Sequence, residues 1–266
     1  MSYETILVDK DGYITTITLN RPDRLNVVSQ QMIQELSHVF NDLREDDETR
    51  FVIITGEGRI FSAGADLNDS RSAAERGKDY HVWDRRRSQK KGHEFMKLLE
   101  SLEQVTIVAF NGLAVGAGIA MSQACDFRIA AESASFLIAE TNIGIFYTYG
   151  STPRLVRLIG PAKAKELIMT AETIDAQEAL RIGLVNKVVP DRELMGAAHE
   201  MIGKIASRAP VAVRMTKMIV NAVSKPTIGD VSLYEPDLVE RLYLSDDPRE
   251  GLAAFFGKRK PSFTGK

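Results

Sequence analysis

The stretch VTIVAFNGLAVGAG, residues 105–118, is the most informative part of this chain. Residues 105–110 are apolar apart from one threonine, which is typical of a strand buried on both faces. Residues 111–118 are mostly glycine and alanine. Because small side chains leave peptide N–H groups unshielded, a ligand can come close to such a backbone. The sequence therefore predicts a buried strand that ends in an open, small-residue turn.

A second pair of segments repeats this arrangement earlier in the chain. The apolar run FVIIT, 51–55, is followed by FSAGADL, 61–67. One glycine-rich turn alone is usually a tight turn that packing requires. Two of them can aim two N–H groups at one oxygen and stabilise an oxyanion or enolate. We therefore expect the chemistry where 61–67 and 111–118 meet.

The remaining segments alternate between strand and helix patterns. Runs 5–8 and 13–19 flank Asp11-Gly12, which predicts a β-hairpin. Apolar residues recur at helical spacing behind Ser29, a residue type that suits an N-cap. Strand–helix–strand alternation favours an α/β fold with parallel pairing. The predicted helices are 32–43, 84–103, 119–124 and most of the chain from 151 onward.

Bulk properties are those of an ordinary globular protein. The 266 residues are 44% hydrophobic and 26% charged, with a net charge of -2 and a pI of about 6.1. This balance does not favour nucleic acid or an anionic membrane as the main partner. Cys125 is the single cysteine, which excludes an internal disulfide. No apolar run reaches the ~18 residues of a membrane span, and the N-terminus lacks a signal-peptide pattern, so we expect a cytoplasmic protein.

Metal, dinucleotide and P-loop sites are not indicated. Gly116-Ala117-Gly118 begins a GxGxxG pattern, but Met121 stands at its third glycine position. No Gly-Lys-Ser/Thr follows, which excludes a P-loop. The histidines lack metal-type spacing and are His38, His81, His93 and His199. We expect neither a metal nor a redox cofactor.

Several blocks, in this order, resemble a known family. They are Asn20-Arg21-Pro22 with Leu25-Asn26, 61–67, 111–118, Ala124-Cys125-Asp126 with Ile129-Ala130, Ala176-x-Glu178-Ala179 with Gly183-Leu184-Val185, and Ala254-Phe255-Phe256 to Lys260-Pro261. Together they resemble the crotonase superfamily, the enoyl-CoA hydratase and isomerase family. The resemblance implies a spiral α/β core of β-β-α turns over 1–200 and a helical C-terminal region, 201–266. That region would complete the acyl-CoA site and form a homotrimer or a dimer of trimers.

The resemblance also implies the catalytic groups. The backbone N–H groups of Ala65 and Ala117 would bind the thioester carbonyl oxygen. Glu140 falls on one of the two glutamates that hydratases of this family use. It ends the apolar segment 135–139, and burial there would raise its proton affinity, which suits a group that accepts and returns a proton.

Ala120 stands where the other hydratase glutamate is expected. Hydration of an enoyl thioester is divided between two carboxylates in this family, whereas moving a double bond from the 3 to the 2 position needs only one. Our first choice is therefore a Δ3-Δ2 enoyl-CoA isomerase, with coenzyme A as part of the substrate. The alternative is an enoyl-CoA hydratase with a substituted second acid/base. Further alternatives are an acyl-CoA hydrolase or decarboxylase, or a non-catalytic acyl-CoA or RNA-binding protein.

Residues 145–151 also depart from the family pattern, because Tyr147 and Thr148 stand where Pro and Gly are usual, and Tyr149 adds a second phenol. The two tyrosines could line the acyl pocket, and one of them could replace the missing glutamate. Alternatively, both pack beneath a helix that begins near Ser151.

The substrate-binding residues follow from the resemblance alone. The adenine would lie against Ala63, Asp66 and Leu67. The pantetheine and pyrophosphate would lie beside Arg24 and Leu25. Phe255 and Lys258 would complete the site from the C-terminal helix. The polar segment 68–84 is the best candidate for a mobile segment. The basic residues 85–87, 90 and 91 most simply form a solvated surface and support RNA binding only weakly.

Overall fold

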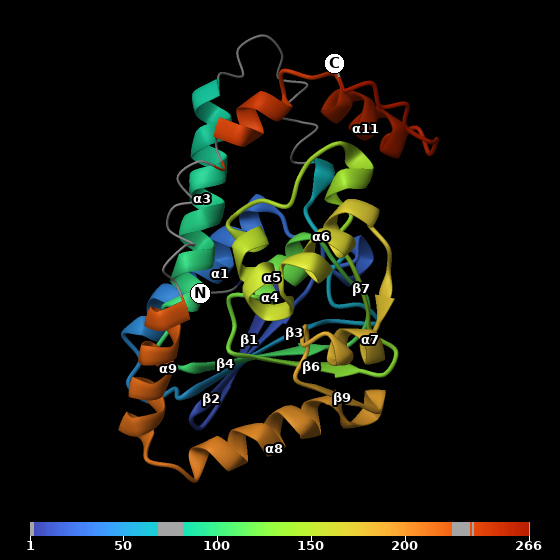
Figure 1. The fold of residues 1–266 in the computed structure, drawn as a ribbon. Coiled ribbons are helices and arrows are strands. Elements are labelled where there is room, and N and C mark those ends of the chain that lie inside the picture. The colour runs from blue at the N-terminus through green and yellow to red at the C-terminus, as the bar shows by residue number, and fades with distance from the viewer. Residues whose placement is uncertain (1–2, 69–81, 225–234, 236, 266) are drawn as a thin grey trace.

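The computed structural model describes residues 3–68, 82–224, 235 and 237–265 (Figure 1). Most of the segment 68–84, predicted to be mobile, lies outside the described residues. Within them, no helix is both long and apolar enough to cross a membrane.

A six-stranded sheet forms the centre of the molecule, in the order β1-β2-β3-β4-β6-β9. The predicted hairpin pairs β1 and β2 antiparallel, and every later neighbour is parallel. A smaller sheet has the order β5-β7-β8. The strands of the first sheet are β1 Ile6–Asp11, β2 Ile14–Leu19, β3 Phe51–Gly56, β4 Val105–Phe110, β6 Phe127–Ala131 and β9 Lys187–Val189, and those of the second are β5 Ala114–Val115, β7 Ser135–Leu137 and β8 Ile174–Asp175.

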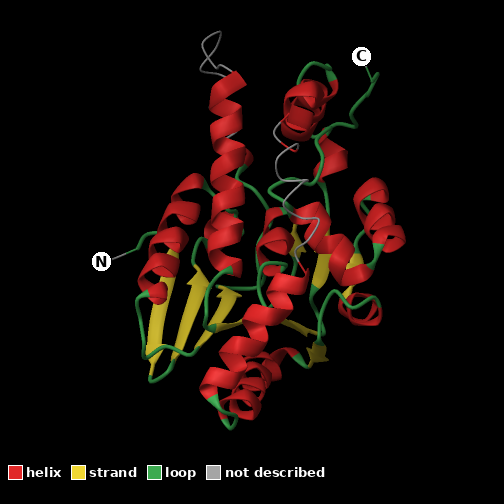
Figure 2. Ribbon diagram, turned by 60° about the vertical axis from the view of Figure 1, so that its left-hand side comes forward, coloured by secondary structure: helices red, strands yellow, loops and turns green. Residues whose placement is uncertain are grey.

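Helices cover both faces of the large sheet, as the unbroken apolar runs of β3 and β4 require. Val52 and Ile54 point into the cluster shared with α1 (Gln30–Arg44) and α3 (Val82–Glu100). The alternate residues Phe51 and Ile53 point into the cluster shared with α8 (Leu194–Ala206), which runs beneath the sheet in Figure 1. The turned view of Figure 2 shows helices on either side of the strands.

The helix predictions differ from the structure mainly at their ends. Ser29 is the N-cap of α1, because its Oγ accepts the Met32 N–H at 3.2 Å. The remaining α-helices are α4 Ala117–Ser122, α5 Ser151–Ile159, α6 Pro161–Thr170, α7 Ala176–Arg181, α9 Pro210–Ser224 and α11 Asp247–Phe256, and the 3-10 turns are η1 Pro22–Arg24, η3 Glu140–Ile143 and η4 Asp191–Glu193. The division predicted between residues 200 and 201 falls inside α8 and stays a prediction.

The C-terminal helix α11 packs on η3 with almost no space between the backbones. A Cβ on Gly251 would lie 2.3 Å from the Ile143 carbonyl oxygen, and one on Gly144 would lie 2.6 Å from that of Asp247. Both positions therefore require glycine, which allows the two segments to touch. The end of the chain is in this way fixed against the loop that follows β7.

Phe110, at the end of β4, gives a test of the core that supports the small-residue turns. Its ring centroid lies 4.8 Å from that of Phe61 and 4.9 Å from that of Phe136, both edge-on, and all three side chains are buried. We expect Phe110→Ala to lower the free energy of unfolding by about 3–5 kcal/mol. Urea denaturation measures the change. The control Phe263→Ala removes a ring that is 42% exposed, and an equal effect of both would contradict this packing.

Candidate active site

The two small-residue turns lie side by side. Ser62 and Ala114 form a parallel β-bridge, and the Val115 N–H donates to the Ser62 carbonyl at 2.8 Å. A Cβ on Gly64 would lie 3.3 Å from the Val115 carbonyl oxygen. Gly64 also has φ +95, a backbone conformation that favours glycine. The glycine thus permits both the turn and its contact with the second turn.

The amides of Ala65 and Ala117 are both available to a ligand. Gly64 and Asp66 each bond to Val28, through the Gly64 carbonyl and the Asp66 N–H, so the Ala65 N–H between them is not part of this bridge. Ala117 is the first residue of α4, where an N–H has no acceptor inside its own helix. Within the described residues, neither N–H has a hydrogen-bond acceptor.

A buried polar strap before α1 holds the first turn in place. The Asn26 side chain is completely buried, and its Nδ2 donates to the carbonyls of Glu57 and Ile60 at 2.9 and 3.1 Å. Its Oδ1 accepts the Arg21 N–H at 2.8 Å. The Arg21 guanidinium forms an ion pair at 3.0 Å with Asp66, the residue that follows Ala65. Sequence reasoning used Arg21 and Asn26 only for the family resemblance and gave neither a role.

Glu140 places its carboxyl group against the second turn. A Cβ on Gly116 would lie 2.5 Å from Glu140 Oε1, and Gly116 has φ 40. Oε2 is buried and has no hydrogen-bond partner among the described residues. Burial raises the pKa of Glu140 from 4.5 to about 7, although the backbone amides of Glu140 and Ala139 act in the opposite direction. A carboxyl group with this pKa can accept and return a proton near neutral pH.

These groups open into a cavity of about 930 Å³, a size typical of small-molecule sites. Its lining is mostly apolar and includes Ile143 and Ile145 after Glu140 and Phe256 from α11. Most of the predicted site residues line it: Arg24, Leu25, Ala63, Ala65, Asp66, Leu67, Glu140 and Phe255. Ala117 follows the lining residue Gly116, and Lys258 lies just beyond α11 without lining the cavity.

The two tyrosines lie elsewhere, so their predicted place in the acyl pocket is corrected. Tyr147 is 1% exposed and accepts a hydrogen bond from Gln123 Nε2 at 3.1 Å. Burial raises the pKa of Tyr147 well above its ordinary value, so the phenol keeps its proton. The Tyr147 carbonyl accepts from Thr152 Oγ1 in α5, and the ring of Tyr149 lies against Gly92 of α3. Both tyrosines therefore fit the alternative of packing beside α5.

Ala120 is 4% exposed and belongs to the apolar core around α4. Among the residues that the structure describes, the ionisable side chains that line the cavity are Asp23, Arg24, Asp66 and Glu140. Of these, Asp66 forms an ion pair with Arg21. Asp23 and Arg24 belong to the short 3-10 turn η1. Glu140 is therefore the carboxyl group placed to move a proton beside the two open amides.

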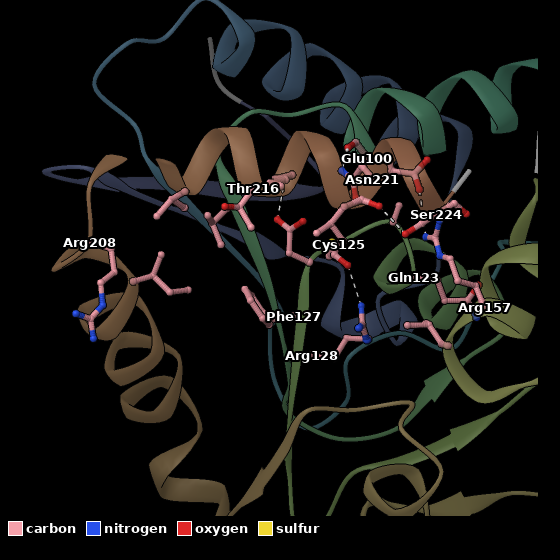
Figure 3. A pocket seen from close by; sticks show the side chains of 18 of the residues that line it. Glu100, Gln123, Cys125, Phe127, Arg128, Arg157, Arg208, Thr216, Asn221 and Ser224 are labelled. Atoms are coloured by element: carbon pink, nitrogen blue, oxygen red, sulfur yellow. Dashed lines mark hydrogen bonds and ion pairs between the residues drawn. The ribbon is translucent and has the colours of Figure 1, made fainter. Parts of the chain in front are cut away.

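A second cavity of about 660 Å³ lies between α9 and β6 (Figure 3). Four of its charged residues form ion pairs: Lys217 with Asp126 at 2.7 Å and Arg157 with Glu100 at 3.3 Å. Arg128 donates to the backbone carbonyls of Leu184, Ser122 and Cys125. Burial raises the pKa of Cys125 to about 12, so its thiol stays protonated. The first cavity, which Glu140 and Ala65 line, is therefore the candidate active site. Among the described residues, no cluster of His, Cys, Asp and Glu is arranged to hold a metal ion.

Comparisons with known proteins identify the family of this chain. Residues 9–266 match the family described as enoyl-CoA hydratase/isomerase. The chain is 37% identical to the short-chain-enoyl-CoA hydratase of Clostridium acetobutylicum, over 98% of this chain and 97% of that one. It is 35% identical to the crotonyl-CoA hydratase of Syntrophomonas wolfei over 100% of both. A crystal structure of an enoyl-CoA hydratase from Mycobacterium avium subsp. paratuberculosis superposes with a TM-score of 0.86 at 27% identity, covering 99% of this chain and 100% of that chain.

The raised pKa of Glu140 predicts a pH-dependent stability difference. An acid whose pKa is higher in the folded chain contributes stability below its unfolded pKa, and this is lost as pH rises through the folded pKa. The pKa values of 4.5 and about 7 set that window. As the pH rises through this window, we expect the free energy of unfolding of Glu140→Gln to increase by up to about 3 kcal/mol relative to that of the wild type.

Unfolding by urea, repeated across this pH range for both proteins, measures the difference. The control Glu132→Gln changes a carboxyl group on an exposed residue. If the difference between wild type and Glu140→Gln does not vary with pH, the Glu140 carboxyl group is solvated and the site described above is wrong.

Proposed function

This chain belongs to the enoyl-CoA hydratase/isomerase family, the crotonase superfamily, and from that premise we propose how it acts on an enoyl-CoA thioester. The thioester carbonyl oxygen binds the N–H groups of Ala65 and Ala117. The observation that carries this proposal is the Glu140 carboxyl group, buried against Gly116 in the cavity that Ala65 lines. One proton-transfer group and two open amides are what enolate chemistry at C2 needs.

The two amides act on the charge that develops during the reaction. When C2 gains or loses a proton, negative charge gathers on the thioester oxygen. These N–H groups have no acceptor in the described part of the chain, so they can stabilise this charge without first breaking a hydrogen bond. Each such donor contributes about 3 kcal/mol of transition-state stabilisation.

Hydration is the reaction that the comparisons support better, because both relatives named above are hydratases. The isomerase that the sequence placed first is therefore not confirmed. In hydration, the water oxygen bonds to C3 and a proton is added to C2. Under this proposal the Glu140 carboxylate takes a proton from the attacking water. The Glu140 carboxyl group then gives that proton to C2 and returns to its starting protonation state.

Double-bond migration remains a second candidate because of Ala120. A buried alanine in the apolar core stands where the family's second glutamate is expected. Glu140 alone would take a proton from C2 of a 3-enoyl thioester and return it to C4. This transfer requires no activated water, so a single carboxylate suffices.

The substrate's coenzyme A portion is assigned to the remaining cavity residues. Arg24 and Leu25 lie beside the first turn, and Phe255 enters from α11. The chain needs no other cofactor under this proposal. We also propose that the protein is cytoplasmic and forms a homotrimer or hexamer. Exposed apolar residues of α9 support the assembly: Val211, Met218, Ile219 and Val223.

The test offers the purified protein crotonyl-CoA and a 3-enoyl-CoA in D2O. Hydration, double-bond migration and deuterium incorporation are followed separately. We expect Glu140→Gln to lower the wild-type rate by about 10²- to 10⁴-fold, because it removes the proton-transfer group but keeps its shape. Glu132→Gln, on an exposed residue, is the control.

Each result decides one part of the proposal. Hydration that depends on Glu140 supports the hydratase, and migration without hydration supports the isomerase. Full activity of Glu140→Gln in both reactions would refute the proposed role of this carboxyl group.

A further inference from the structure

A cluster of buried charged and polar side chains contacts Gly150, at the end of the loop that carries Glu140: His93, Glu100, Arg154 and Glu235. Its central residue is Glu235, 2% exposed, which belongs to the C-terminal part of the chain. Glu235 Oε2 accepts the N–H of Gly150 at 2.8 Å. The same oxygen lies 2.9 Å from His93 Nε2 of α3. These contacts join three distant parts of the sequence at one point.

The cluster holds both polar groups of the Gly150 residue. While Glu235 accepts its N–H, its carbonyl accepts from Arg154 Nη1 at 2.9 Å. Arg154 in turn reaches Glu100 at 2.8 Å, and both of these side chains are buried. Gly150 has φ 70, and a Cβ there would lie 2.9 Å from Arg154 Nη1. Charge-assisted hydrogen bonds of this kind are about twice as strong as neutral ones.

Gly150 ends the segment 140–150, which begins with Glu140. This segment has no long regular element of its own, since η3 is a single short turn. Its internal backbone hydrogen bonds are local, such as the bond from Ile145 N–H to the Glu140 carbonyl. Its middle also lines the cavity through Ile143 and Ile145. The position of the segment therefore depends on contacts made from outside it.

The C-terminal part of the chain makes such contacts at two places. Glu235 holds Gly150 at the far end of the segment. Helix α11 packs on Ile143 and Gly144 near its start, through Gly251 and the Asp247 carbonyl. The first contact is a hydrogen bond to a carboxylate and the second is close backbone packing. Together they leave the segment 140–150 clamped at both ends by residues that follow it in sequence.

We propose that Glu235 is a positioning residue for the reaction: by holding Gly150, it keeps the segment 140–150 in the place where Glu140 lies against Gly116. This inference rests on the proposed function, in which Glu140 moves the proton. Proton transfer requires donor and acceptor within hydrogen-bond reach. A displacement of about 1 Å in a reacting group can lower the rate about 10²-fold.

The test compares Glu235→Ala, Glu235→Gln and Glu235→Asp in the full chain, with the substrate that the wild type turns over. Glu235→Ala removes the acceptor of the Gly150 N–H, so we expect kcat to fall about 10- to 100-fold and KM to change less. Glu235→Gln keeps an oxygen at the same reach, so we expect it to recover most of kcat. Glu235→Asp keeps the charge on a shorter side chain and should stay impaired.

The matched control is Asp237→Asn, two residues further along. It breaks an exposed ion pair with Arg86, and such pairs contribute little. If Glu235 only stabilises the fold, melting temperatures fall while the kcat of folded protein stays at the wild-type value. That result, or a wild-type kcat for Glu235→Asp, would overturn the proposal. Should Glu235→Ala not fold, the comparison of Glu235→Gln with Glu235→Asp decides.

Glu140→Gln is measured in the same experiment so that the two proposals fail separately. If Glu140→Gln remains active, the proposed function is wrong whatever the Glu235 variants do. If Glu140→Gln is inactive and all Glu235 variants retain the wild-type kcat, only the positioning role is wrong.

Discussion

The site depends on one close contact, the Glu140 carboxyl group against the bare Cα of Gly116. Any side chain at Gly116 would occupy the place of Glu140 Oε1. The same glycine has a positive φ, which turns the chain into α4 and leaves the Ala117 N–H without an acceptor in that helix. A single residue without a Cβ therefore opens the amide, makes room for the carboxyl group and buries it. Burial in turn gives that carboxyl group its proton affinity.

The elements around this contact hold it from different directions, and each uses buried polar groups. Asn26 and Arg21 fix the first turn through backbone carbonyls and Asp66. The bridge between Ser62 and Ala114 fixes the second turn to the first. The loop that carries Glu140 has no long regular element of its own, and it is held by α5 and α6 and, at Gly150 and Gly144, by the C-terminal part of the chain. Because buried polar groups are expensive when unpaired, each of these contacts is also specific in its geometry.

Local sequence patterns predicted the strands and helices that have a regular spacing of apolar residues. The apolar runs of β3 and β4 and the N-cap Ser29 follow from local chemistry, and the family blocks supplied the fold class, which the comparisons confirm. The start of α4 was placed two residues late, because the turn at Gly116 has no helical periodicity. The place of Tyr147 was left open between acyl pocket and core, because a phenol in a loop can face either. The link between His93, Gly150 and Glu235 could not be predicted, since nothing local relates residues so far apart in sequence.

The reaction itself depends on how many proton-transfer groups the cavity holds, and here residues and relatives point in different directions. The hydratase names of the relatives favour addition of water, while Ala120 removes the position where a second carboxylate is expected. The Glu140 carboxyl group, with a pKa of about 7, is present in both protonation states at neutral pH. It can therefore act as a base toward water or C2 and return the same proton within one turnover. Under the proposed function, both reactions pass through an enolate that the two amides would stabilise. Hydration differs from migration in one requirement, a water held at C3 within reach of the proton-transfer group.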